Sequence, residues 1–277
     1  MSRTIGFVKM SGAGNDFIVL GPGQAERIGA DKTGWIRRVC RRRLSVGADG
    51  VLVVEPGGGD RVKVTFRNPD GSPAFCGNGS RCAARFAHIS GMAGTAMTLE
   101  TAAGDLAAEI VGDQVRLRLP APIDHGVKNF DLGGQRVAGR FVSAGVPHFV
   151  VVDRDFAADA LQRWGPPIRR DPVFGPDGAN LDLVRRSEDG SLRVRTWERG
   201  VEGETLSCGS GAVAAAFVVR LANGPRTARV VPASGIPLTV QLPGAPEHPD
   251  AAILEGDARL IFEGRLGVDA ISDRLGD

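Results

Sequence analysis

The stretch CGNGSRCAARF at Cys76–Phe86 has a partial second copy, CGSGAVAAAF, at Cys208–Phe217. Both copies read Cys-Gly-x-Gly and continue into an alanine-rich segment, and the second lies 132 positions after the first. Another matched pair lies upstream at the same spacing, with NDFIV at Asn15–Val19 and PHFVV at Pro147–Val151. Self-similarity at one fixed period in a chain of 277 residues indicates that one structural unit occurs twice.

We expect the two halves to be 1–122 and 123–277, with the last strand free to return to the N-terminal half. In each half, short apolar and alternating runs predict strands on both sides of one long helix that starts at the cysteine motif. This mixture predicts an α+β fold. The helix expected at Ala212–Leu221 is apolar nearly all round, so a sheet should wrap around it and bury it.

Three less regular segments complete this prediction. The spacing of Ile36, Val39 and Cys40 predicts a helix at 33–44. A shorter helix is expected at 156–163. The proline-rich piece PAPID at 120–124 is expected to be the linker between the halves.

Charge and composition narrow the classes of function. The chain has 34 basic and 32 acidic residues, and this balance gives no general case for a nucleic-acid partner or a membrane surface. No apolar run approaches the ~20 residues of a membrane span, and no signal peptide is visible. Four cysteines without secretory context therefore indicate reduced thiols and a cytoplasmic protein. Because Cys76 and Cys82 lack the spacing of zinc ligands, we expect no metal site.

Cys76 and Cys208 each stand at the start of a predicted helix. The first N–H groups of a helix lack internal partners and its N-terminus carries partial positive charge, so both features favour a thiolate. The following glycines let a ligand approach the backbone, where a substrate carboxylate could bind the same N–H groups. A structural cysteine in a glycine turn is the alternative for either copy alone, but two copies at one offset favour a functional pair. Cys40 and Cys82 are expected to be core residues.

Other polar residues allow two interpretations each. Glu198 and Arg199 could bind an ammonium and a carboxylate together, or could form an ordinary surface pair. Asn68 is a turn residue by its neighbours, but its amide could also face a cleft. His148 could tune a thiol or be a structural histidine.

Two apparent nucleotide signals have simpler explanations. The basic run at Arg37–Arg43 fits the solvated face of an amphipathic helix better than a nucleic-acid site. The pairs of glycines at 12–14 and 77–79 do not complete the Gly-x-Gly-x-x-Gly pattern of a dinucleotide loop.

Taken in order, these motifs make the sequence similar to the diaminopimelate epimerase family. They are GNDF at 14–17, GADG at 47–50, NPDGS at 68–72, CGNG at 76–79, PH at 147–148, GAN at 178–180, ERG at 198–200 and CGSG at 208–211. The resemblance implies an isomerase that interconverts LL- and meso-diaminopimelate on the route to lysine and peptidoglycan. It also implies no cofactor, two pseudo-symmetric halves that are each a curved mixed β-sheet around a central helix, and a possible homodimer.

The resemblance also assigns roles to residues. Cys76 and Cys208 would be the acid and base, and His148 and Glu198 would tune the thiols. The contacts to the carboxylate at the reacting centre would come from Gly77, Asn78, Gly209 and Ser210. The contacts to the distal amino acid end would come from Asn68, Asn180, Glu198 and Arg199, with Asn15 nearby. The chain departs from the family at Val146, where Asn is usual.

Two rival functions remain open on the sequence. A proline racemase-like enzyme would share the architecture and the thiol pair, but its first motif typically reads Cys-Gly-His-Gly and its second lacks Glu-Arg-Gly. A thiol redox or ligand-binding protein on the same scaffold is the other rival. A redox pair is more often Cys-x-x-Cys, which this sequence lacks.

Overall fold

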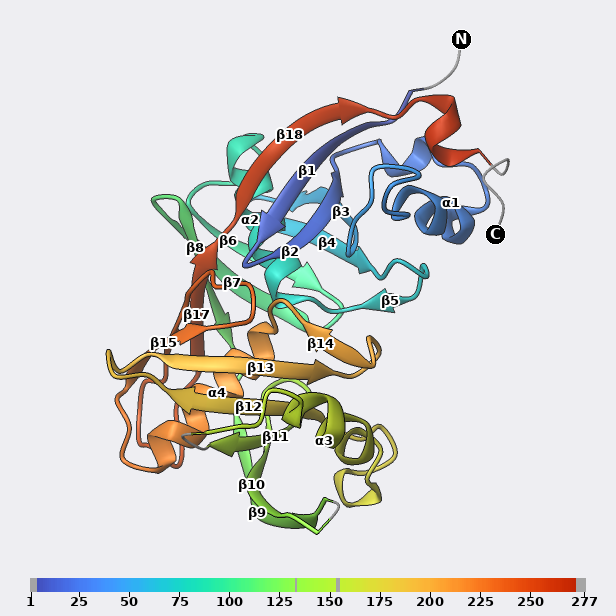
Figure 1. Ribbon diagram of the computed structural model, residues 1–277. Helices are drawn as coiled ribbons and strands as arrows, with labels where there is room; N and C mark the ends of the chain where they lie inside the picture. Colours follow the sequence, from blue (N-terminus) through green and yellow to red (C-terminus); the bar gives the residue numbers. More distant parts are fainter. Residues whose placement is uncertain (1–3, 133, 153–154, 273–277) are drawn as a thin grey trace. The chain divides into compact units, whose positions relative to one another are not determined.

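The structure is a computed structural model that describes residues 4–132, 134–152 and 155–272 (Figure 1). The chain divides into two compact units. Unit 1 contains the described residues of 1–117 and 256–277, and unit 2 contains those of 118–255. The halves 1–122 and 123–277 were predicted from the sequence repeat, and these bounds stay a prediction.

Unit 1 is a mixed sheet with one long helix. Its strands are β1 (Gly6–Gly12), β2 (Asn15–Leu20), β3 (Gly50–Gly58), β4 (Arg61–Arg67), β5 (Pro73–Ala74), β6 (Ala96–Thr101), β7 (Gly104–Val111), the first part of β8 (Gln114–Leu119), and β18 (Arg259–Arg265). β2 pairs with β3 and β4 with β6 in parallel, whereas β1–β2, β3–β4 and β6–β7 are antiparallel. The long helix is α2 (Gly77–Ile89), and a shorter helix is α1 (Lys32–Val39).

Strand β18 joins this sheet from the far end of the chain. It runs antiparallel to β1, with Gly6 opposite Arg265. Figure 1 shows the two strands side by side, β1 in blue and β18 in red. Residues separated by most of the sequence are therefore neighbours in one sheet.

Unit 2 repeats the same order of elements. Its strands are β9 (Ile123–Asp131), β10 (Arg136–Ser143), β11 (Pro147–Val152), β12 (Asn180–Arg186), β13 (Leu192–Glu198), β14 (Gly203–Thr205), β15 (Thr227–Val231), β16 (Leu238–Gln241) and most of β17 (Ala252–Asp257). The pairs β11–β12 and β13–β15 are parallel, and β10–β11, β12–β13 and β15–β16 are antiparallel. The helices are α3 (Ala160–Arg169) and α4 (Gly209–Leu221). Short 3₁₀ turns lie at Ala25–Arg27, Pro172–Phe174 and Val268–Ile271.

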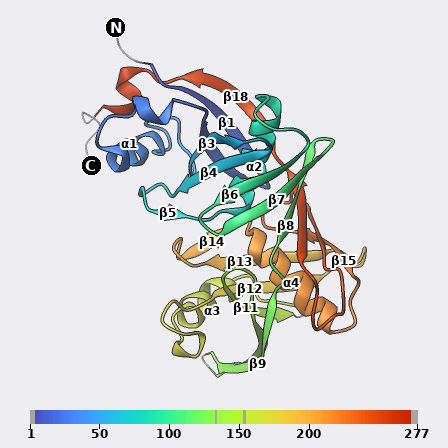
Figure 2. The ribbon, with the colours of Figure 1, turned by 180° about the vertical axis from the view of Figure 1, so that it is seen from behind.

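The repeat seen in the sequence is also a repeat of structure. Helix α4 begins and ends 132 positions after α2, and β11 stands at the same offset from β2. Helix α4 packs against β11, β12 and β13, as the reverse view shows (Figure 2), and nearly all of its residues are buried. The predicted α+β class, with two repeated units of mixed sheet and a central helix, is confirmed.

Helix α1 is shorter than predicted. It begins at Lys32, where the Asp31 carboxylate accepts from the Gly34 amide, and it ends at Val39 rather than at residue 44. In the turn that follows the helix, Arg43 adopts a positive φ of 71°. The amide of Gly47 then bonds the Val39 carbonyl, so a carbonyl of the last turn finds a partner. The apolar spacing alone did not reveal this reversal.

Two segments at the start of unit 2 have other bounds than the sequence predicted. The linker at 120–124 is shorter than expected because β9 begins at Ile123 and pairs with β10 along its length. The helix expected at 156–163 is found as α3 at Ala160–Arg169 and includes Pro166 and Pro167. Its buried apolar face continues through both prolines to Ile168, so tertiary packing extends the helix past a local breaking signal.

Candidate active site

In unit 1 the thiol of Cys76 caps helix α2. Cys76 has extended backbone angles, φ −140° and ψ 113°, and its sulfur accepts a hydrogen bond from the Gly79 amide at 3.4 Å. A helix N-cap normally uses an oxygen acceptor in this role, so the sulfur sits where the free N–H groups of the first turn converge. The side chain is half-buried and forms no disulfide.

A chain of amides holds the first turn of α2. The Asn78 amide donates to Oδ1 of Asn15 at 2.6 Å, and the Asn15 amide donates to Asp49 at 3.0 Å. The Asp16 amide donates to the same Asp49 oxygen. Burial alone would raise the pKa of the Asp16 carboxyl, but hydrogen bonds from Arg42 and Lys9 lower it below its usual value. Asn15 and Asn78 are therefore hydrogen-bonded to each other, and Asn15 is held by the charged side chain of Asp49.

A buried arginine extends this network. Arg81 is fully buried one turn into α2, and it donates to Asn78 Oδ1 at 2.9 Å and to the Asp257 carbonyl at 3.3 Å. The Asp257 carboxylate accepts from the amide of Ala13 at 2.6 Å. Ala13 has a positive φ of 54° in the turn that leads to Asn15, so this bond helps to hold a strained residue.

Asn68 does not join this network. Its amide donates to the Ser72 hydroxyl at 3.0 Å, and its backbone carbonyl accepts from Gly71. The Ser72 hydroxyl donates in turn to Asp70. The structure thus places Asn68 in the turn that its neighbours predict.

In unit 2 the thiol of Cys208 stands at the matching position of α4. Its backbone angles, φ −121° and ψ 112°, are close to those of Cys76. Its sulfur lies 3.3 Å from the hydroxyl of Ser210. The side chain is buried and the thiol is free. The same helix-start geometry therefore occurs in both units.

The expected lowering of the pKa is wrong for Cys208. Burial, and then the negative charges of Glu198 and Asp182, raise the pKa of this thiol well above its usual value. The Ser210 hydroxyl and the Gly211 amide act in the opposite direction but more weakly. Desolvation disfavours the charged thiolate more than a helix N-terminus stabilises it. Cys208 is thus held protonated at neutral pH.

His148 lies close to the Cys208 thiol and is completely buried. Its Nδ1 is 2.6 Å from the Asp182 carboxylate, and its Nε2 is 3.0 Å from the Ser210 hydroxyl. Asp182 also accepts from the Thr196 hydroxyl at 2.6 Å, across the antiparallel pair β12–β13. His148 is therefore neither exposed nor isolated.

Asn180 and Arg199 are linked through the backbone. The amide N–H of Arg199 donates to Asn180 Oδ1 at 2.7 Å, and the Asn180 amide nitrogen lies 3.5 Å from His148 Nε2. The guanidinium of Arg199 is only loosely paired, 3.7 Å from the exposed carboxylate of Asp177. Glu198, the last residue of β13, is half-buried.

Within each unit the predicted residues mostly come together. Unit 1 gathers Asn15, Cys76, Gly77 and Asn78, and unit 2 gathers His148, Asn180, Glu198, Arg199, Cys208, Gly209 and Ser210. Sequence reasoning missed Arg81 in unit 1 and Asp182 and Thr196 in unit 2. The sequence signal for Arg81 was a charged residue within an alanine-rich helix. The signal for Asp182 was an acidic residue between leucines in an apolar strand.

The remaining cysteines are core residues, as predicted. Cys40 and Cys82 are buried, and burial raises the pKa of Cys40 to about 12 and that of Cys82 further. Cys82 packs against Gly12, where an added Cβ would lie 3.2 Å from its sulfur. Both thiols are therefore unsuited to acid–base work near neutral pH.

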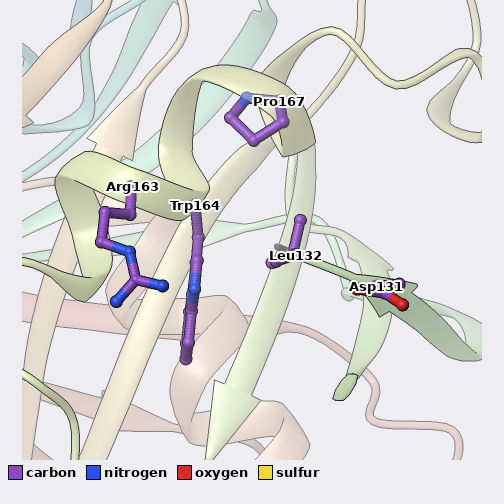
Figure 3. Close-up of a pocket in the computed structure, with 5 residues that line it drawn as sticks. All are labelled: Asp131, Leu132, Arg163, Trp164 and Pro167. Carbon is purple, nitrogen blue, oxygen red and sulfur yellow. The ribbon is translucent and has the colours of Figure 1, made fainter. Parts of the chain in front are cut away.

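A separate cavity of about 310 Å³ lies between α3 and the end of β9 (Figure 3). Asp131, Leu132, Arg163, Trp164 and Pro167 line it, and none of the predicted site residues does. Within the described ranges, no cluster of three or more His, Cys, Asp or Glu side chains could hold a metal ion. No helix in the described part of the chain is long and apolar enough to cross a membrane.

Comparison with known proteins identifies the family. The family model described as diaminopimelate epimerase matches residues 7–119 and 140–260. A diaminopimelate epimerase of Aquifex aeolicus is 37% identical over 96% of this chain and 99% of its own length. One from Hydrogenobaculum sp. is 36% identical over 94% and 98%.

The chain belongs to the diaminopimelate epimerase family. A third relative, from Methanocella arvoryzae, is 37% identical over 96% of this chain. Solved structures extend the likeness of fold: a probable proline racemase from Agrobacterium radiobacter has a TM-score of 0.70 at 19% identity, covering 95% of this chain and 93% of its own. A hydroxyproline epimerase from Agrobacterium vitis has a TM-score of 0.68 at 19% identity, covering 99% and 94%. At such low identity these structures show a shared fold and nothing finer.

Proposed function

We propose that this member of the diaminopimelate epimerase family interconverts LL- and meso-diaminopimelate with Cys76 and Cys208 as its acid–base pair. One observation carries the proposal: each unit places a reduced cysteine at the N-cap of its alanine-rich helix, with nearly the same backbone angles. The choice of substrate rests on relatives named diaminopimelate epimerase that match over nearly their full length.

The chemistry requires two groups on opposite faces of one carbon. One thiolate removes the α-proton while the other thiol delivers a proton from the opposite side, so the configuration inverts. Burial raises the pKa of the Cys208 thiol, so Cys208 is suited to donate a proton in the resting protein.

Helix N-termini stabilise the charge that forms during proton transfer. Removal of the α-proton places negative charge on the substrate carboxylate. The first-turn N–H groups of Gly77, Asn78, Gly209 and Ser210 are suited to bind it, because helix α2 begins at Gly77 and α4 at Gly209. Exclusion of water would strengthen each of these interactions.

The distal end of diaminopimelate is itself an amino acid and needs both charges recognised. Glu198 and Arg199 offer a carboxylate and a guanidinium side by side at the end of β13, and the guanidinium is only loosely held by Asp177. We assign Asn15, Asn68 and Asn180 to the same end as hydrogen-bonding groups. Val146 has no side-chain amide, so these three asparagines must bind the substrate without the contact that Asn would make at this position.

The test is incubation with LL-diaminopimelate in heavy water. We expect meso-diaminopimelate carrying deuterium at the inverted carbon, without added pyridoxal phosphate or metal. Inversion without deuterium, or no inversion, would contradict the proposal. The proline racemase-like alternative is not favoured, because its structural counterpart is only 19% identical whereas the epimerase relatives reach 37%. Proline serves as the control substrate.

We also propose that the protein works in the cytoplasm as a homodimer. Catalytic thiols must stay reduced, which the cytosol provides. Strand β18 carries three exposed apolar side chains, Leu260, Ile261 and Phe262, and among the described strands it pairs with β1. An apolar edge strand of this kind is suited to pairing with a second copy. Sedimentation should give a dimer that Ile261→Lys shifts to monomer, and a wild-type monomer would refute this assignment.

A further inference from the structure

A continuous line of polar groups runs inward from the Cys208 sulfur. The sulfur lies 3.3 Å from the Ser210 hydroxyl, and that hydroxyl lies 3.0 Å from His148 Nε2. On the other side of the ring, Nδ1 lies 2.6 Å from the Asp182 carboxylate, which also accepts a hydrogen bond from the Thr196 hydroxyl. His148 and Asp182 have no exposed surface, so water does not compete for these bonds.

The contact with Asp182 indicates which ring nitrogen carries a proton. An ionised carboxylate only accepts hydrogen bonds, so Nδ1 of His148 must donate to it. A neutral imidazole that carries its proton on Nδ1 has an acceptor at Nε2. The Ser210 hydroxyl then donates to Nε2, and its oxygen is free to accept from the Cys208 S–H.

Asn180 supports the same assignment independently. The backbone N–H of Arg199 donates to Asn180 Oδ1 at 2.7 Å, which fixes the orientation of the amide. The amide NH₂ therefore faces His148 Nε2, at 3.5 Å. Only an unprotonated Nε2 can accept from this amide, and it can then accept from the Ser210 hydroxyl as well.

We propose that Ser210 and His148 form a proton relay for Cys208, and that Asp182 is the residue that positions it. The inference rests on the proposed function in that Cys208 serves as acid and base. In the relay step, the Cys208 S–H bond breaks as an O–H bond forms on Ser210, while the original Ser210 O–H bond breaks as an N–H bond forms at His148 Nε2. One proton moves inward, leaving a thiolate and an imidazolium beside the Asp182 carboxylate.

The relay answers a difficulty that the site creates. Burial and the charges of Glu198 and Asp182 hold the Cys208 thiol protonated through a raised pKa. An epimerase must nevertheless use Cys208 as a base when the substrate arrives in the opposite configuration. Passing the proton to His148 forms a thiolate–imidazolium pair, which is less costly in a buried site than a lone thiolate.

Unit 1 carries different residues at the positions that correspond to the relay. The positions that match His148 and Asp182 at the repeat offset are Asp16 and Gly50. Among the described residues of unit 1, the buried guanidinium of Arg81 interacts electrostatically with Cys76. The relay should therefore act on one thiol of the pair, and disabling it should leave Cys76 unaffected.

The first experiment reads the tautomer of His148 directly. The chain has four histidines, and ¹⁵N-histidine NMR with His148→Gln assigns the signal of interest. We expect the Nδ1–H form in the wild type and its loss in Asp182→Asn. An Nε2–H form in the wild type would overturn the proposal.

The second experiment measures alkylation of each cysteine by iodoacetamide, followed by mass spectrometry. Ser210→Ala keeps the backbone N–H but removes the hydroxyl. Ser210→Ala and Asp182→Asn should slow alkylation of Cys208 at neutral pH by about tenfold or more, as for a thiol pKa raised by at least one unit. Cys76 should change less than about twofold on the same scale.

Ser143→Ala is the matched control, because the Ser143 hydroxyl bonds exposed His125 at 2.8 Å in the same unit. It should leave both rates unchanged. Unchanged Cys208 alkylation in Ser210→Ala would refute the relay, even if Asp182→Asn fails to fold. Neither readout needs substrate, so a failure of the relay and a failure of epimerase activity are distinguishable. In an active enzyme both variants should lower kcat with KM nearly constant.

Discussion

Gly211 leaves room for the carboxylate of Asp182. A Cβ built on Gly211 would lie 2.6 Å from Asp182 Oδ1 and 3.0 Å from the Thr196 hydroxyl. The second glycine of the CGSG motif therefore permits a buried acid to lie against the first turn of α4. The glycine serves packing inside unit 2 as well as access to the backbone.

Gly211→Ala should thus disturb the acid rather than the helix, since alanine favours a helix. We expect a loss of unfolding free energy of about 1–3 kcal/mol, as for overpacking in a core, and a fall in kcat. Urea unfolding with parallel activity assays checks this. Gly29→Ala is the control, because a Cβ added at Gly29 would have no atom within 4 Å and the φ of this residue is not positive. Equal behaviour of the two variants would contradict the packing argument.

Replacing either proposed catalytic thiol should abolish epimerisation. Cys76→Ala and Cys208→Ala each remove one of the two proposed proton-transfer groups, and Cys76→Ala also removes the acceptor of the Gly79 amide at the start of α2. Cys82→Ala should keep most of the activity, although its buried side chain makes some loss of stability expected. Deuterium incorporation and thermal unfolding are the measurements. Comparable losses of activity in all three variants would mean that the pair is misassigned.

Arg199→Ala should weaken recognition of the distal amino acid end. The loss in kcat/KM should correspond to at least ~2 kcal/mol, because a charged group of the substrate is left without its partner. Arg229→Ala is the matched control, since Arg229 is also loosely paired, 3.7 Å from an exposed aspartate. The wild type should not turn over proline. Full activity of Arg199→Ala, or racemisation of proline, would count against the substrate assignment.

Arg81→Met should destabilise unit 1 and impair the site. The change removes the donors to Asn78 Oδ1 and to the Asp257 carbonyl while roughly keeping side-chain volume. The loss of these two buried hydrogen bonds should cost about 1–3 kcal/mol each. Urea unfolding gives the stability, and Arg85→Met, one turn further along α2, is the control because Arg85 is only half-buried. If stability does not change, the buried guanidinium is not what holds Asn78.

The proposed thiol pair also predicts reversible oxidation. All four cysteines are free in the structure. If Cys76 and Cys208 act on one carbon, peroxide should join them in a disulfide when no substrate is bound, and substrate should protect them. Mass spectrometry before and after reductant checks this. A bridge between Cys76 and Cys82, or only sulfinic acid at Cys76, would contradict the proposed pairing.

The sequence by itself determined the repeat and the elements that carry it. Apolar alternation and the Cys-Gly-x-Gly starts are local signals, so helix α2 was placed within one residue of its observed bounds. The same local signals placed both thiols at helix starts and Cys40 and Cys82 in the core. These features depend on residues a few positions apart, which is the range over which backbone propensity and hydrophobic period act.

Only the tertiary structure decided the partners of each site residue. Asp182, Thr196 and Ser210 come from β12, β13 and α4, and no local pattern brings them to His148. Burial reversed the expected direction of the Cys208 pKa, because desolvation depends on atoms from many parts of the chain. The extension of α3 through its prolines depends equally on packing of its buried face. Local sequence specifies the elements, whereas protonation and hydrogen bonding depend on which elements meet.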